Sequence, residues 1–103
     1  MQYIIKLMDW MDDEIEMAEK YAKAAEHCAE EKNTSHVSAY SSMARQELEH
    51  YEKLHHMVLD KIAKKSDDKT AHEIIMQMFE CKHKWQAKEI AEIRYMLESA
   101  EKF

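Results

Sequence analysis

The segment Glu47-Leu48-Glu49-His50 sets a carboxylate and an imidazole three positions apart. In a helix, residues i and i+3 lie one turn apart on the same face, so Glu47 and His50 can reach a common point. Glu47 also falls on the apolar face of its segment, whereas Glu49 points away from that face. Carboxylate oxygen together with imidazole nitrogen suits iron or manganese, so this spacing indicates a metal site.

Glu14 is a second carboxylate that falls among apolar positions. At about 100° per residue it lies close to the direction of Leu7, Met11 and Ala18, while Asp12 points elsewhere. Burial of a lone carboxylate is costly unless the group is protonated, paired or bound to a cation. Glu14 is therefore a third candidate metal ligand.

Helices must position these side chains, because the hydrophobic pattern repeats every three to four residues along almost the whole chain. We predict an all-α fold with helices over residues 3–31, 35–65 and 68–101 of one domain that spans residues 1–103. The breaks between them are so short that consecutive helices must run antiparallel as neighbours. Glu14 and Glu47 then lie at similar heights, near the middle of the first and second helices.

Polar residues mark both breaks. In the first, Asn33 can end one helix, and Thr34 or Ser35 can cap the next. In the second, the candidate helix caps are Ser66, Asp67 and Asp68.

The apolar stripes predict which residues form the core. On the third helix the stripe includes Ile74, Ile75, Phe79, Trp85, Ile90, Ile93 and Leu97. Several further apolar residues lie off the three stripes, namely Trp10, Met17, Met57, Met76 and Met96. We therefore expect a second chain to cover part of the surface.

The composition excludes several classes of function. The 103 residues include no glycine and no proline, whereas phosphate-cradling loops, dinucleotide-binding fingerprints and nucleophile elbows all need glycine. A formal net charge of −6 would repel a phosphate backbone, so we expect no nucleic-acid partner.

The expected location is the cytoplasm. Cys28 and Cys81 lie 81 − 28 = 53 positions apart, so we expect two free thiols in a reducing compartment. The first residues reach Asp9 too early for the apolar core of a signal peptide, and no apolar run approaches the roughly 18 residues of a membrane span.

Two segments carry a resemblance to a known family. The stretch from Glu14 to Tyr21, together with Ala44-Arg45-Gln46-Glu47-Leu48-Glu49-His50, resembles the first helix pair of the rubrerythrins, which belong to the ferritin-like superfamily. The interval 47 − 14 = 33 is similar as well, and the resemblance covers about residues 7–62. It implies a non-haem di-iron carboxylate site with Glu14, Glu47 and His50 as ligands, in proteins that oxidise ferrous iron or reduce peroxide.

The chain departs from that family in two ways. A rubrerythrin-like bundle has two such helix pairs in one chain, and this chain has a single pair followed by a third helix. It also lacks the rubredoxin-like part with its paired cysteines, so the electron donor for peroxide reduction is unknown.

A homodimer, or a higher even oligomer, would complete the site. A two-fold axis brings the same residues from each partner together, and two copies of Glu14, Glu47 and His50 amount to four carboxylates and two imidazoles. Their charge balances two divalent cations. We expect two iron ions per dimer, or manganese in their place, with oxygen or peroxide as the oxidant. Tyr21 and Tyr40, each seven residues from a ligand, are expected core aromatics and candidate hydroxyl donors to the ligand carboxylates.

Other readings stay open. Glu80-Cys81-Lys82-His83 is a second Glu-x-x-His motif that offers alternative ligands within one chain, but the resulting set would be incomplete. We expect Glu80 and His83 to be solvated, while Phe79 and Trp85 pack the third helix on the bundle. A dimeric helical interaction module whose inward glutamates are protonated or hydrated would also fit the sequence, as would a non-catalytic metal-binding cargo or sensor subunit.

Overall fold

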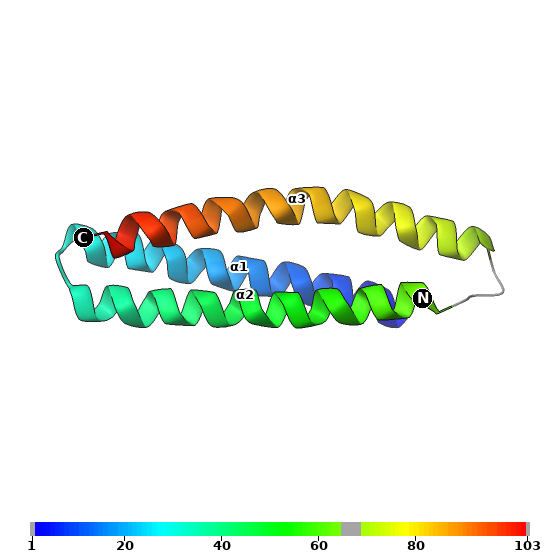
Figure 1. The fold of residues 1–103 in the computed structure, drawn as a ribbon, viewed down its shortest axis with the longest axis horizontal. Coiled ribbons are helices and arrows are strands. Elements are labelled where there is room, and N and C mark those ends of the chain that lie inside the picture. Colours follow the sequence, from blue (N-terminus) through cyan, green and yellow to red (C-terminus); the bar gives the residue numbers. More distant parts are fainter. Residues whose placement is uncertain (1, 65–68, 103) are drawn as a thin grey trace.

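The computed structural model describes residues 2–64 and 69–102. These residues form three helices and no strand: α1 (Gln2–Glu30), α2 (Thr34–Ala63) and α3 (Lys69–Glu101). The helices alternate in direction along a bundle 57 Å long (Figure 1). The all-α class and the antiparallel order are thus confirmed. None of the described helices combines the length and the apolar character needed to cross a membrane.

The helix ends differ slightly from the predicted ones. Helix α1 begins and ends one residue earlier than predicted, and α2 begins one residue earlier. Helix α2 ends at Ala63 because the backbone of Lys64 is extended, with φ −73° and ψ 125°. The predicted boundaries at residues 65 and 68, and the predicted caps Ser66, Asp67 and Asp68, lie outside the described residues.

The turn between α1 and α2 differs from the prediction in which residues do the capping. Lys32, with φ 59°, takes a left-handed conformation just after α1, so it ends the helix in place of Asn33. The amides of Lys32 and Asn33 donate to the carbonyls of Ala29 and Cys28, which is the Schellman ending of a helix. The side-chain oxygen of Asn33 then accepts a hydrogen bond from the His36 amide, so Asn33 caps α2 in place of Thr34 or Ser35.

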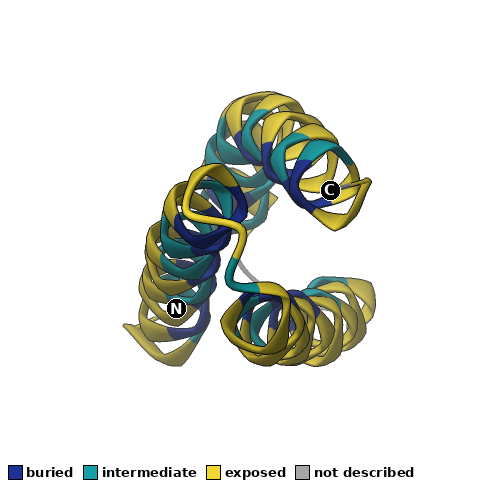
Figure 2. Ribbon diagram, turned by 90° about the vertical axis from the view of Figure 1, so that its left-hand side faces the viewer, coloured by how far each residue is buried: buried dark blue, intermediate teal, exposed yellow. Residues whose placement is uncertain are grey.

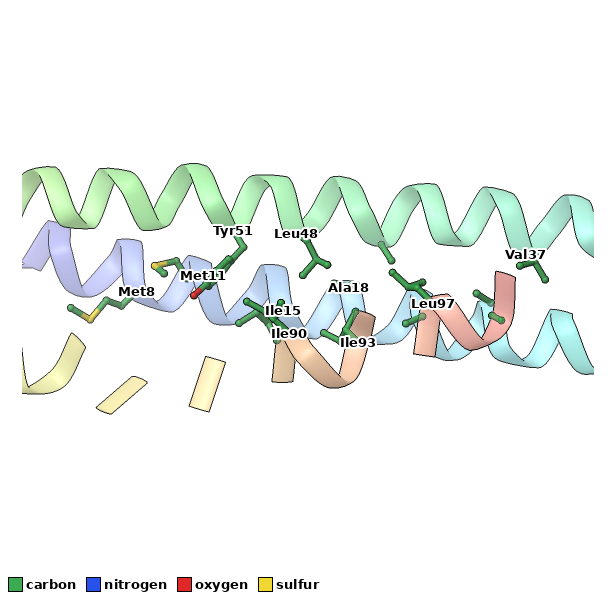
Figure 3. Close-up of a cluster of buried hydrophobic side chains, with 14 of the residues drawn as sticks. Met8, Met11, Ile15, Ala18, Val37, Leu48, Tyr51, Ile90, Ile93 and Leu97 are labelled. Carbon is green, nitrogen blue, oxygen red and sulfur yellow. The ribbon is translucent and has the colours of Figure 1, made fainter. Parts of the chain in front are cut away.

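The core lies along α1, which packs most extensively against α2 and less extensively against α3 (Figure 2). Large side chains such as Met11, Ile15 and Leu48 fill the layer between the helices (Figure 3). Ala18, Ala22 and Ala25 are fully buried, and their small side chains let the neighbouring backbones approach α1 closely. Leu7, Met11 and Ala18, which mark the predicted apolar direction of the first helix, are buried as expected.

The predicted stripe of α3 is wrong at two positions. Ile74 and Trp85 are each 48% exposed, whereas Gln86 is 1% exposed and sits in line with the buried Ile75, Ile90 and Ile93. A step of one residue turns a helix by about 100°, so burial of Gln86 rotates Trp85 out of the core. Polar partners make the burial of Gln86 tolerable: its amide nitrogen donates to Asp12 at 2.9 Å, and its amide oxygen accepts from Tyr51 at 3.1 Å.

Candidate metal centre

The structure brings Glu14 of α1 together with Glu47 and His50 of α2. One ligand atom from each of the three side chains lies within 4.8 Å of the other two. The Nδ1 atom of His50 is 3.5 Å from Oε2 of Glu14 and 3.8 Å from Oε2 of Glu47. Among the described residues, these three form the one group of three or more histidine, cysteine and acidic side chains whose ligand atoms already lie this close to one another.

The register of the antiparallel pair α1 and α2 explains this convergence. Toward one end of the pair, the Lys61 ammonium lies 5.5 Å from the centre of the Tyr3 ring. Toward the other end, the rings of Tyr21 and Tyr40 stack with their centres 6.4 Å apart. The metal-ligand candidates lie between these two contacts, where the register places residue 14 opposite residues 47 and 50.

Of the three side chains, Glu14 is the one whose charged form is disfavoured by its surroundings. Its Oε2 atom is buried and has no hydrogen-bond partner. Burial and the nearby Glu47 carboxylate raise the pKa of Glu14 from 4.5 to about 7, and His50 only partly opposes this shift. Near neutral pH, the Glu14 carboxyl group therefore either keeps its proton or needs a nearby cation to stabilise its charged form.

The cluster lies on the seam between α1 and α2, on the side away from α3. Asp12 contacts Lys82 and Gln86 of α3, and Glu14, two residues further along α1, points about 200° away from it. The side chains of Glu14 and Glu47 are 24% and 21% exposed, and that of His50 is 53% exposed. The site therefore opens to the outer face of the helix pair and is not enclosed by the three-helix core.

Exposed apolar side chains surround this opening. Trp10 and Met17 lie one turn either side of Glu14 on α1, Met43 lies one turn before Glu47, and Met57 lies two turns after His50. All four are more than one third exposed. The half-buried ligands thus sit in an apolar surface that no part of the described chain covers.

Tyr21 and Tyr40 lie at the same end of the cluster, where they are partly buried against the core and stack on each other with an interplanar angle of 24°. Within the described residues, neither hydroxyl donates a hydrogen bond to Glu14 or Glu47. Their expected role as core aromatics is confirmed; their role as hydroxyl donors stays a prediction.

Glu80 and His83 do not join this cluster. Glu80 is exposed on α3, as expected. His83 is also exposed, but its ring centre lies 5.7 Å from that of Phe79, on which it stacks, and 5.2 Å from that of His55 of α2. Cys28 and Cys81 are both free, in agreement with the prediction of two thiols.

Two features of the described chain were not anticipated from the sequence. One is the polar network in which Asp12 joins Lys82 and Gln86; Asp12 was expected to point away from the core. The other is the contact between His55 and His83. The sequence did contain a signal for the His55–His83 contact. Glu52-Lys53-Leu54-His55 repeats the Glu-x-x-His spacing, on the side of α2 that faces α3.

Comparisons of the chain with protein-family models, curated proteins and solved structures find no match. The likeness to rubrerythrins therefore rests on the residues that carry it.

Proposed function

We propose that the protein is a di-iron carboxylate oxidoreductase that reacts Fe(II) with oxygen or peroxide. The observation that carries the proposal is the convergence of Glu14, Glu47 and His50 within 4.8 Å. The donor chemistry fits iron, because two carboxylates and one imidazole, without thiolate, match its ligand preference. The buried Oε2 of Glu14 has no hydrogen-bond partner, and a bound cation would supply a close, favourable contact to it.

The proposed site needs a second copy of the chain. One protomer offers two carboxylates and one imidazole, fewer ligands than two metal ions require. The exposed surface around Trp10, Met17, Met43 and Met57 gives a second copy an apolar area to cover. A two-fold axis beside His50 would bring two half-sites together and form a four-helix bundle from two α1–α2 pairs. Helix α3, on the opposite side, leaves this face free.

The chain's own residues would perform three tasks in this reaction. Glu14 and Glu47 would hold the cations, and their negative charge would favour the ferric state. Glu14, whose pKa is about 7, would release its proton when a cation binds and could take one up again when the cation leaves. The apolar rim would limit access of water. Two bound ferrous ions would supply two electrons, the number that reduces oxygen to peroxide or peroxide to water.

Titration with Fe(II) tests the proposal. Oxygen or peroxide is added to wild type, to Glu47→Gln and to Glu49→Gln, and ferric absorbance is followed in the near ultraviolet. Glu49 is exposed on the same helix and serves as the matched control. We expect saturation at one iron per chain in wild type and in Glu49→Gln, and loss of the saturable phase in Glu47→Gln. Identical traces for all three proteins would remove the proposal.

The raised pKa of Glu14 favours one alternative. A carboxyl group that holds its proton near pH 7 can hydrogen-bond to Glu47 without any cation, as in a helical interaction module. Such a module would purify without metal and would show no thermal stabilisation by Fe(II). A site that binds iron only in the folded state must show stabilisation.

A further inference from the structure

Two imidazole rings meet in a groove between α2 and α3, on the opposite side of α2 from His50. The ring centres of His55 and His83 are 5.2 Å apart, with an angle of 35° between the ring planes. The groove has a volume of about 270 Å³, and Glu52 and Arg94 line it together with the two histidines. This cluster shares no residue with the Glu14 site.

The environment of His55 suits a metal ligand. Its Nδ1 atom is buried and has no hydrogen-bond partner. A buried polar atom without a partner is unfavourable, and a bound cation would supply that partner. Burial, with the charges of His83 and His56, lowers the pKa of His55, and Glu52 acts in the opposite direction. The neutral imidazole, which is the form that binds metal, is therefore favoured at neutral pH.

We propose that His55 and His83, together with Glu52, bind a divalent cation of the zinc, copper or nickel type and thereby join α2 to α3. With a metal–nitrogen bond of about 2.1 Å and a tetrahedral angle, two imidazoles on one zinc ion have ring centres roughly 5 Å apart. The observed 5.2 Å matches this separation. The ligand atoms of His55, His83 and Glu52 do not all lie within 4.8 Å of one another in this structure. Glu52 lies one turn before His55, and its exposed side chain would turn toward the rings when the cation binds.

The charge and ligand type of this site separate it from the first one. Two imidazoles with one carboxylate suit zinc, copper and nickel as well as iron, whereas the first site offers two carboxylates and one imidazole. The negative charge of Glu52 offsets the positive charge of Arg94 at the same groove. Helices α2 and α3 make the least extensive contact in the bundle, so a shared cation would add a cross-link where packing contributes little.

Zinc binding by calorimetry tests this site. All proteins carry Glu47→Gln to disable the Glu14 cluster and Cys81→Ser to remove the exposed thiol near His83. Into this background we introduce His55→Gln, His83→Gln or, as the control, His36→Gln, since His36 is exposed near the start of α2. We expect one Zn²⁺ per chain in the background and in the control, with affinity reduced about tenfold or more by His83→Gln.

Thermal unfolding with and without Zn²⁺ gives a second readout. The upward shift of the midpoint should be present in the background and in His36→Gln, and lost in both His55→Gln and His83→Gln. His83 is exposed, whereas His55 is partly buried, so His83→Gln should fold even if His55→Gln does not, and the test stays decisive. The proposal is overturned if the background protein binds no zinc, or if the His83→Gln variant binds zinc as tightly as the background protein does. Because the background lacks Glu47, neither result depends on iron chemistry.

Discussion

Tyr51 donates a hydrogen bond of 3.1 Å to Oε1 of Gln86, and this contact joins α2 to α3 inside the core. The amide nitrogen of Gln86 continues the network by donating to Asp12, which also accepts from the Lys82 ammonium at 2.6 Å. A single buried amide therefore connects all three helices. The network also sets how α3 is rotated against the other two helices, because Gln86 can be buried only where both partners reach it.

Replacement of Gln86 by leucine should destabilise the protein even though leucine is more apolar. The Tyr51 hydroxyl and one Asp12 oxygen would lose their buried partner, at a cost of about 2 kcal/mol in the free energy of unfolding. Urea unfolding measures this change. Gln77→Leu, at an exposed position of α3, is the control and should change stability by less than about 0.5 kcal/mol. Equal stability of the two variants would show that the network contributes nothing.

The metal-free protein should lose stability as the pH rises through neutrality. Because the pKa of Glu14 is about 7 in the folded chain and near 4.5 in the unfolded chain, the folded chain holds more protons between these values. Glu14→Gln should therefore match wild type near pH 4.5 and exceed its unfolding free energy by about 1–2 kcal/mol at pH 8, allowing for partial solvent access.

Urea unfolding in the presence of a chelator at pH 5 and pH 8 checks this difference. Glu16→Gln, on the exposed side of α1, should follow the pH profile of wild type. A Glu14→Gln profile parallel to wild type at both pH values would contradict the predicted shift.

The proposed dimer predicts a specific effect of charge on the outer face of the α1–α2 pair. Met43→Lys or Met57→Lys would place an ammonium in the apolar contact and should shift the protein toward monomer, with reduced iron stoichiometry despite intact ligands. Light scattering coupled to size-exclusion chromatography measures the mass. Tyr95→Lys on α3, at a residue that is 71% exposed, should leave the mass unchanged. A dimer that tolerates both methionine substitutions would place its interface elsewhere.

The buried alanines of α1 should not tolerate enlargement. Ala22 is fully buried, and Ala22→Leu should lower the free energy of unfolding by about 1–3 kcal/mol through overpacking. Ala39→Leu, at an exposed position of α2, should change it by less than about 0.5 kcal/mol. Thermal and urea unfolding compare the two. Similar stabilities would mean that the helices can separate at Ala22 without cost.

The sequence predicted the helices well because hydrophobic periodicity and capping are local properties. The alternation of apolar and polar residues placed the helix ends within two residues wherever the described chain tests them. The prediction of the core was wrong at Trp85 and Gln86. Gln86 can be buried because Tyr51 of α2 and Asp12 of α1 hydrogen-bond to its amide group, and the local sequence pattern carries no information on such partners from other helices. Likewise, Asp12 faces α3 because Lys82 and Gln86 of that helix donate hydrogen bonds to its carboxylate.

The convergence of Glu14, Glu47 and His50 followed from the sequence alone, because short connections force α1 and α2 to be antiparallel neighbours and the i, i+3 spacing fixes a common face. Only the tertiary structure decided on which side of that pair α3 lies. It packs against the side that carries Asp12 and Tyr51, so the candidate ligands lie at an open apolar face. The physical reason is that the position of α3 depends on side-chain partners distant in sequence, whereas the pairing of α1 and α2 depends on a short turn.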